Sequence, residues 1–254
     1  RTRHVSAPIN NKSSTRWLYQ TATKYIVTTG ERLKETLVRD NGFDANRIES
    51  VTTGIDTRRF VPGDKAAARK QLGLPADAPV IGIVATMRGW KGHSYLLQAF
   101  AQLPFKQARL LMVGHGPQFE NLQSQARELQ IGDRVIMPGN QEDVVSWLQA
   151  MDVFALPSWA NEGVPQALLQ AMLAARPIVT TSVGSISEAI SDGSNGIIVP
   201  TQNAEALHQA LLKLLEQPAY AEKLGQAARA TALEKFGFDR MIDRMEKIFH
   251  AISN

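Results

Sequence analysis

The stretch VIGIVATMRGWKGHSYLLQAFAQLPFKQARLLMVGHG, residues 80–116, decides the fold class. It opens with a continuous apolar and β-branched run, continues into the helical pattern SYLLQAFAQL, and ends in a second apolar run before a glycine-containing turn. Strands that are apolar throughout belong to a parallel sheet that is covered on both faces. The stretch therefore predicts a strand, a helix and a second parallel strand of an α/β domain.

The same alternation continues as far as residue 200. Further strands are predicted at 134–139, 153–158, 177–182 and 195–200, and helices at 117–130, 141–151, 164–174 and 185–191. This order of elements with short loops is typical of a doubly wound α/β domain.

The first fifth of the chain has a different organisation. Strands are predicted at 2–6 and 24–30, helices at 14–22 and 31–41, and a third extended piece at 48–56. Two and a half βα units do not complete a sheet. We therefore expect the end of another α/β domain whose beginning is absent, so that the chain is truncated at its N-terminus. A proline-punctuated connector follows, and an amphipathic helix is predicted at 238–252. The predicted boundaries are 1–57, 58–236 and 237–254.

Composition narrows the function classes. The 254 residues include no cysteine, which excludes disulfides and thiol chemistry, and no apolar run approaches the roughly 20 residues of a membrane-spanning helix. Residues 1–50 hold nine Lys and Arg against five Asp and Glu, whereas the remainder holds 19 of each. This basic segment could face phosphates, an anionic lipid surface or an acidic acceptor, and an ordinary solvated face is the alternative. No groove-reading motif accompanies the charge, so nucleic acid is not expected as a partner.

Candidate binding residues follow the predicted strands. In an open parallel sheet, ligands bind at the carboxyl ends of the strands. Arg88 and Lys91 follow the strand at 80–87, and Gly114 and His115 follow the next one. After the strand at 153–158, Pro165 is expected at the first position of a helix, whose free N–H groups favour an anion. Two cations near a helix N-terminus make a diphosphate the natural ligand.

Other chemistries fit the sequence less well. It contains neither a G-x-x-x-x-G-K-[ST] loop nor a G-x-G-x-x-G fingerprint after a strand, and no His or carboxylate cluster has metal-ligand spacing. Ser158 and Ser182 do not lie in a nucleophile elbow. We expect no metal and no cofactor.

The helix at 164–174 carries two amides, Gln166 and Gln170, on one face. A solvated stripe is the ordinary explanation for such a pair, and a ligand contact is the alternative.

At this point the sequence resembles a known family. PSWANEGVPQALLQAMLAARPIVTTSVGSISEAISDGSNGIIVP, residues 157–200, is similar to the signature region of the retaining nucleotide-sugar glycosyltransferases of family 4. RGWKGHSYLLQAF, VGHGP and VTTGIDTRRFVP resemble that family's other blocks. The resemblance implies the GT-B fold, with two Rossmann-like doubly wound parallel-sheet domains. The acceptor domain would come first, incomplete here, and the donor domain second, and the last helix would cross back to the first domain.

The resemblance also implies roles for individual residues. Arg88 and Lys91 resemble the pair that clamps the donor diphosphate, and Glu162 resembles the first acid of the E-x7-E motif near the donor sugar. The second acid of that motif is replaced by Gln170, and His115 stands where an acid is common. The resemblance further implies that His4 faces the reacting sugar. The backbone amides of Gly163 and Val164, next to Pro165, would contact the sugar and the phosphate. The backbone of Asn140 and Gln141 would contact the base.

The expected activity is hexosyl transfer from a nucleoside diphosphate sugar with retention, independent of metal, in polysaccharide or lipopolysaccharide biosynthesis. The partners would be the nucleotide-sugar donor and a saccharide or lipid-linked acceptor, in the cytoplasm or on the inner face of an anionic membrane. The chain by itself is expected to be inactive, because half of the cleft would be missing. A sugar phosphorylase or epimerase on the same fold, or a non-catalytic nucleotide-sugar-binding module, stays open as an alternative.

Overall fold

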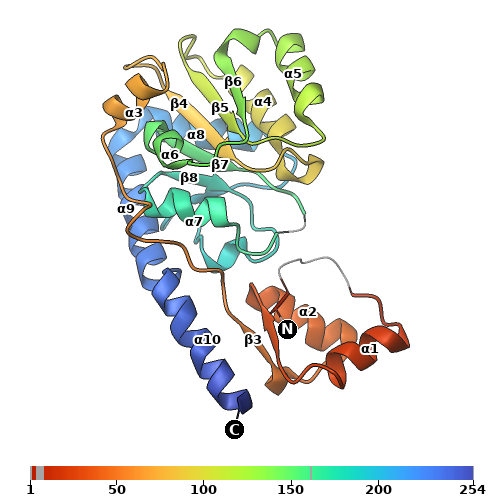
Figure 1. Ribbon diagram of the computed structural model, residues 1–254. Coiled ribbons are helices and arrows are strands. Elements are labelled where there is room, and N and C mark those ends of the chain that lie inside the picture. The colour runs from red at the N-terminus through yellow and green to blue at the C-terminus, as the bar shows by residue number, and fades with distance from the viewer. Residues whose placement is uncertain (1, 4–8, 161, 254) are drawn as a thin grey trace.

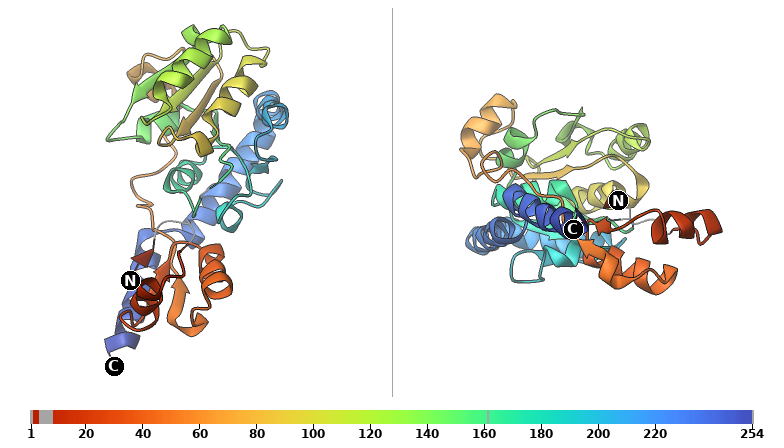
Figure 2. Two further views of the ribbon diagram at one scale, coloured as in Figure 1. Left: turned by 90° about the vertical axis from the view of Figure 1, so that its right-hand side faces the viewer. Right: turned by 60° about the horizontal axis from the view of Figure 1, so that its bottom comes forward.

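The computed structural model describes residues 2–3, 9–160 and 162–253, which form two parallel sheets. Figure 1 shows a large lobe around the second sheet and a smaller one around the first, joined by an extended segment and by a long helical pair along one side. The view turned by 90° in Figure 2 shows that the two lobes follow one another along an elongated molecule.

The large lobe is built on a six-stranded sheet with the order β6-β5-β4-β7-β8-β9, and all its pairs are parallel. Its strands are β4 (Val80–Val84), β5 (Arg109–Val113), β6 (Val135–Gly139), β7 (Val153–Leu156), β8 (Ile178–Thr180) and β9 (Ile197–Ile198). Within this sheet, β4 is the first strand along the sequence. The next two strands, β5 and β6, are added on one side of β4, and β7 is then added on its other side. This order places a topological switch point between β4 and β7.

Helices cover both faces of this sheet. They are α3 (Lys65–Gln71), α4 (His93–Ala101), α5 (Phe119–Glu128), α6 (Val145–Ala150), α7 (Gln166–Leu173), α8 (Ala204–Glu216) and α9 (Pro218–Lys235). The central strands are apolar because both faces are covered, and β4, β5, β7 and β8 carry fully buried side chains such as Ile81, Leu110 and Phe154. The predicted doubly wound α/β fold is confirmed.

One predicted helix is wrong. Residues 185–191 form only a short 3-10 turn at Ile186–Glu188. The buried side chain of Asn195 explains this, because it accepts a hydrogen bond from the Ser191 N–H at 2.7 Å and donates one to the Ala189 carbonyl at 3.0 Å. These bonds close a turn in place of a second helical turn.

Three helices lie outside the predicted set. α3 begins after Asp64, whose carboxylate accepts hydrogen bonds from the N–H groups of Ala66 and Ala67. α8 begins after Asn203, which caps Ala206 in the same way, and α9 begins with Pro218. Each start therefore carries an ordinary helix-start signal.

The small lobe contains the three parallel strands β1 (Thr2–Arg3), β2 (Ile26–Thr28) and β3 (Ile48–Ser50), with the helices α1 (Ser13–Gln20) and α2 (Glu31–Asn41). The last helix, α10 (Phe238–Ser253), runs back along β3 (Figure 1). Ile248 on α10 packs against Val27 and Val51 in the small lobe, and Arg244 forms an ion pair with Glu49 at 2.9 Å.

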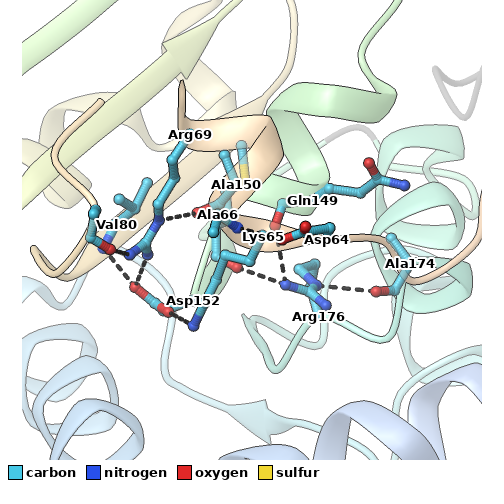
Figure 3. Close-up of polar contacts among 12 residues, drawn as sticks. Asp64, Lys65, Ala66, Arg69, Val80, Gln149, Ala150, Asp152, Ala174 and Arg176 are labelled. Atoms are coloured by element: carbon cyan, nitrogen blue, oxygen red, sulfur yellow. Dashed lines mark hydrogen bonds and ion pairs between the residues drawn. The ribbon is translucent and has the colours of Figure 1, made fainter. Parts of the chain in front are cut away.

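A charged cluster joins the starts of β4 and β7 at the amino edge of the large sheet (Figure 3). Asp152 accepts hydrogen bonds from Arg69 Nη2 at 2.6 Å and from the Val80 N–H at 2.8 Å. Arg69 also donates to the Ala150 carbonyl at 3.1 Å, and Arg176 donates to the carbonyls of Met151 and Ala174. Burial lowers the pKa of the Arg176 guanidinium, although Asp152 acts in the opposite direction. The cluster therefore ties helix ends and strand starts together.

Candidate functional site

Two loops meet at the carboxyl edge of the large sheet, one after β4 and one after β7. The Trp159 backbone N–H donates to the Trp90 carbonyl at 2.8 Å, and its indole N–H donates to the Gly89 carbonyl at 3.0 Å. Because β4 and β7 flank the switch point, these loops lie where an open α/β sheet binds its ligand.

Two glycines allow neighbouring strand-end loops to approach closely, Gly92 between the loops after β4 and β7 and Gly114 between those after β4 and β5. Gly92 has φ +77°, and a Cβ atom there would lie 2.1 Å from the Pro157 carbonyl oxygen. Gly114 has φ +132°, and its Cβ would lie 2.2 Å from the Ala85 carbonyl oxygen. A side chain at either position would therefore push the strand-end loops apart.

Lys91 and Glu162 form a partly buried ion pair between the two loops. Lys91 Nζ lies 2.6 Å from Glu162 Oε1, and the hydroxyl of Ser158 donates to the same oxygen, also at 2.6 Å. Glu162 is 5% exposed and Ser158 is fully buried. The sequence brings Lys91 to this point through the short 3-10 turn Gly89–Lys91, which ends at Gly92. A carboxylate and an ammonium group are thus held together at the switch point.

The start of α7 lies immediately after this pair. Helix α7 begins at Gln166, with Pro165 as the residue before it in extended geometry, so the expected position of Pro165 as first helical residue is wrong by one residue. The N–H groups of Gly163 and Val164 have no hydrogen-bond acceptor among the residues that the structure describes. Free N–H groups beside a helix start can bind an anion.

Arg88 lies in the same loop as Lys91 but has a different contact. Its side chain is exposed, and the guanidinium lies over the ring of Trp90, 5.1 Å from the centroid. Stacking on an indole holds a guanidinium without neutralising it. Arg88 is therefore a charge available to a ligand at this edge.

The loops after β5 and β6 adjoin the β4 loop. The Met87 N–H donates to the His115 carbonyl at 3.1 Å, and the Gly114 N–H donates to the Gly139 carbonyl at 2.9 Å. The exposed His115 ring stacks on Phe119 with centroids 4.6 Å apart. The structure thus brings Gly114 and His115 beside the loop that carries Arg88 and Lys91.

Asn140 and Gln141 follow β6 at the outer end of this row of loops. Both are exposed, and Gln141 Nε2 donates to the Pro138 carbonyl at 3.1 Å. Their position leaves backbone and side-chain groups open to a ligand that extends from β7 across β4 towards β6.

Gln170 lies on α7, half-buried, and forms no side-chain hydrogen bond to the part of the chain that the structure describes. Gln166, one turn earlier, is exposed. The chain between Glu162 and Gln170 is helical only from Gln166 onward, where α7 starts. His4 lies outside the described residues.

A cavity of about 450 Å³ adjoins Glu162 on the side of the small lobe. Its wall combines α2 with the loops after β7 and β8, and it includes Arg32, Thr36, Trp159, Glu162, Ser182 and Ser185. Arg32 Nη1 donates to the Gly184 carbonyl at 3.2 Å, which connects the two lobes at this point. The cavity offers hydroxyl, guanidinium and carboxylate groups beside one indole.

Sequence reasoning missed two residues at this edge. The sequence excludes Ser158 as a nucleophile but does not show its contact with Glu162, which its spacing of four residues allows. His93, 2% exposed, follows Lys91 and Gly92, and neither ring nitrogen has a partner among the described residues. Burial, helped by the charge of Lys91, lowers the pKa of His93 to about 3. No sequence signal distinguishes this buried histidine from an exposed one.

The described residues contain no group of three or more His, Asp or Glu side chains that could hold a metal ion. None of their helices is long and apolar enough to cross a membrane.

The sequence is similar to those of known glycosyltransferases. A D-inositol 3-phosphate glycosyltransferase of Saccharomonospora viridis is 34% identical over 226 residues, which cover 84% of this chain and 52% of that protein. The chain spans about half the length of the curated relatives it matches.

Two solved structures show the same fold. Anabaena HepE in complex with UDP-glucose has a TM-score of 0.90 at 21% identity, covering 98% of this chain and 72% of that one. WaaG, a glycosyltransferase involved in lipopolysaccharide biosynthesis, has a TM-score of 0.78 at 21% identity, covering 86% and 61%. The expected fold class, the α/β GT-B fold, is confirmed.

The sequence profile of one family matches most of the large lobe. It is described as "Glycosyl transferases group 1", and it matches residues 64–231. The chain belongs to the group 1 glycosyltransferase family.

Proposed function

We propose that the protein transfers a sugar from a nucleoside diphosphate sugar to an acceptor, with retention at the anomeric carbon. The observation that carries this proposal is the Lys91–Glu162 pair at the switch point, beside the free N–H groups that precede α7. Family membership supports the class of reaction. The large lobe, 58–236, would hold the donor, while 1–57 would belong to the acceptor side and 237–254 would link back to it.

The barrier of such a transfer lies in charge separation. The bond from the sugar C1 to the diphosphate oxygen breaks, and negative charge develops on the leaving group. Lys91, Arg88 and the N–H groups of Gly163 and Val164 would stabilise that charge without a metal, beside Pro165 and the start of α7. The acceptor oxygen forms the new bond on the same face, and its proton passes to the departing phosphate. Loss of one such donor typically lowers the rate by about 10²–10³.

The remaining groups would hold the rest of the donor. Glu162 would accept hydrogen bonds from sugar hydroxyls, and His4 would face the same sugar. Gly114 and His115 would border the diphosphate, Gln170 the ribose, and the backbone of Asn140 and Gln141 the base. The row of adjacent strand-end loops from β7 to β6 supports this order.

For the donor, we favour a uridine nucleotide, because a structural neighbour is described as a complex with UDP-glucose. For the acceptor, we propose a saccharide, a lipid-linked saccharide or a polyol phosphate. This choice rests on relatives named D-inositol 3-phosphate glycosyltransferase and on WaaG, named for lipopolysaccharide biosynthesis. The basic excess of residues 1–50 would suit an anionic acceptor or peripheral contact with an anionic membrane on its cytoplasmic side.

Calorimetry with UDP, GDP, ADP and the matching nucleosides tests the donor site. We expect one diphosphate to bind measurably more tightly than its nucleoside. In a longer chain with the acceptor domain, the Glu162→Gln variant should lose turnover while it retains that diphosphate. Binding of none of the three diphosphates, or turnover that survives the Glu162→Gln change, would contradict the proposal.

A further inference from the structure

One carboxylate oxygen in the site receives two hydrogen bonds. Lys91 Nζ and Ser158 Oγ both lie 2.6 Å from Glu162 Oε1. Glu162 Oε2 has no hydrogen-bond partner among the described residues. The two donors therefore hold one oxygen of the carboxylate and leave the other available to a ligand.

The two donors differ in how firmly they are fixed. Ser158 is fully buried directly after β7, and its own carbonyl accepts a hydrogen bond from Thr181 Oγ1 at 2.5 Å. Lys91 carries its charge on a flexible four-carbon stem, and its side chain is 19% exposed. A diphosphate at the start of α7 would attract the charged ammonium group of Lys91 far more strongly than the neutral, buried hydroxyl of Ser158.

The backbone of Glu162 packs closely against the loop after β8. Gly184, with φ +59°, lies so close that a Cβ atom there would approach the Glu162 carbonyl oxygen to 1.9 Å. The main chain of Glu162 thus leaves no room for a side chain at Gly184, and among the described residues Lys91 and Ser158 are the groups that bond to its carboxylate.

We propose that Ser158 is a positioning residue, which keeps the Glu162 carboxylate in place when Lys91 moves to the donor diphosphate. This inference rests on the proposed function for the identity of the ligand. It adds that the Lys91–Glu162 pair is exchanged during donor binding and that the Ser158–Glu162 bond persists.

Ser158→Ala is the variant that removes this bond. In a chain with measurable turnover, we expect kcat to fall about 10- to 100-fold, since a hydrogen bond to a charged group is lost. The Kd of the bare nucleoside diphosphate should change by less than about threefold, because Lys91 and the N–H groups before α7 are retained. A loss of diphosphate affinity as large as the loss of kcat would overturn the assignment.

Thr180→Val is the matched control. Thr180 is fully buried in the neighbouring strand, and its hydroxyl donates to the Leu156 carbonyl at 2.8 Å. This variant also loses a buried hydroxyl, but it does not touch Glu162, so kcat should stay within about twofold. If Thr180→Val lowers kcat as much as Ser158→Ala does, the effect is one of stability and the proposal is wrong.

Crystal structures of ligand-free variants test the inference without any donor. In Lys91→Ala, the Glu162 carboxylate should remain within hydrogen-bond distance of Ser158 Oγ. In the double variant Lys91→Ala/Ser158→Ala, it should leave this position. A carboxylate that swings away while Ser158 is present, or that stays when both donors are gone, would overturn the proposal. These crystal structures contain no ligand, so they test the position of the Glu162 carboxylate even if no nucleoside diphosphate binds. Failure of the proposed function can therefore be distinguished from failure of this inference.

Discussion

The two edges of the six-stranded sheet each carry a partly buried ion pair with the same 2.6 Å separation, Arg69–Asp152 at the amino edge and Lys91–Glu162 at the carboxyl edge. At the amino edge the charged groups also bond to the backbone of several elements, including Val80 and Ala150. At the carboxyl edge, Glu162 Oε2 and two backbone N–H groups have no partner among the described residues. The number of satisfied groups, rather than the length of the ion pair, separates a structural cluster from a binding site.

The difference follows from what each edge must do. The amino edge receives the C-terminal ends of helices α6 and α7, whose last carbonyls need donors, and Arg176 supplies them. The carboxyl edge receives the N-terminal end of α7, where N–H groups without an acceptor among the described residues can bind an anion. No side chain among the described residues caps the start of α7, so these N–H groups are available to a ligand.

Removal of Asp152 should have the largest effect on stability. Asp152→Ala leaves Arg69, 4% exposed, without its carboxylate. Breaking a buried pair in this way costs about 3–5 kcal/mol, measured as the free energy of unfolding in urea. Lys65→Ala is the control, because Lys65 contacts the same carboxylate at 2.7 Å from an exposed position and should cost at most about 1 kcal/mol. Equal losses in the two variants would show that the amino-edge cluster is not the structural element described above.

Lys91→Ala should affect ligand binding more than stability. The loss of a charge-assisted bond should weaken a nucleoside diphosphate by about 1.5–3 kcal/mol, roughly 10- to 100-fold, and the nucleoside far less. Arg88→Ala should act in the same direction. Lys65→Ala removes a cation from the opposite edge and should leave both affinities unchanged. Calorimetric titration of the three variants measures these affinities. Equal losses of affinity for the nucleoside and the diphosphate in Lys91→Ala or Arg88→Ala would contradict the assignment of these residues to the diphosphate.

His93 should make the protein less stable in acid. Its pKa is about 3 in the folded state and near 6.5 when unfolded, so the unfolded chain binds the proton first. Stability is therefore lost as the pH falls below 6.5, by about 2 kcal/mol between pH 6 and pH 4.5 for this group alone.

The variant His93→Leu should remove that part of the pH dependence, because leucine cannot be protonated. Urea unfolding of both proteins at several pH values measures the difference. The same slope in His93→Leu as in the parent protein would show that other groups cause the acid sensitivity.

Gln170→Ala should have the smallest effect. If its amide holds the ribose, its loss should weaken a ribonucleotide by about 0.5–1.5 kcal/mol, about two- to tenfold, and the deoxyribonucleotide less. Gln166→Ala is the control, since Gln166 is exposed one turn earlier on the same helix. Unchanged affinity for UDP, GDP and ADP in Gln170→Ala would establish Gln170 as a solvated residue.

The fold was predictable because the strands are buried on both faces and read as apolar runs. The meeting of the loops after β4 and β7 was predictable too, since strand ends share one edge of a parallel sheet. The amino-edge cluster was not, because Arg69 and Arg176 mainly contact backbone carbonyls, which leave no pattern in the sequence. The helix predicted at 164–174 begins later than expected, at Gln166, because Gly163 to Pro165 form a loop before α7.

Hydrogen exchange of the chain with and without a saturating nucleoside diphosphate tests the central contrast most directly. We predict slower exchange in residues 85–92 and 162–167, which include the free N–H groups before α7, and no change in residues 65–80 and 174–177 at the amino edge. Protection confined to the amino edge, or spread equally over both edges, would contradict the assignment of the carboxyl edge as the donor site.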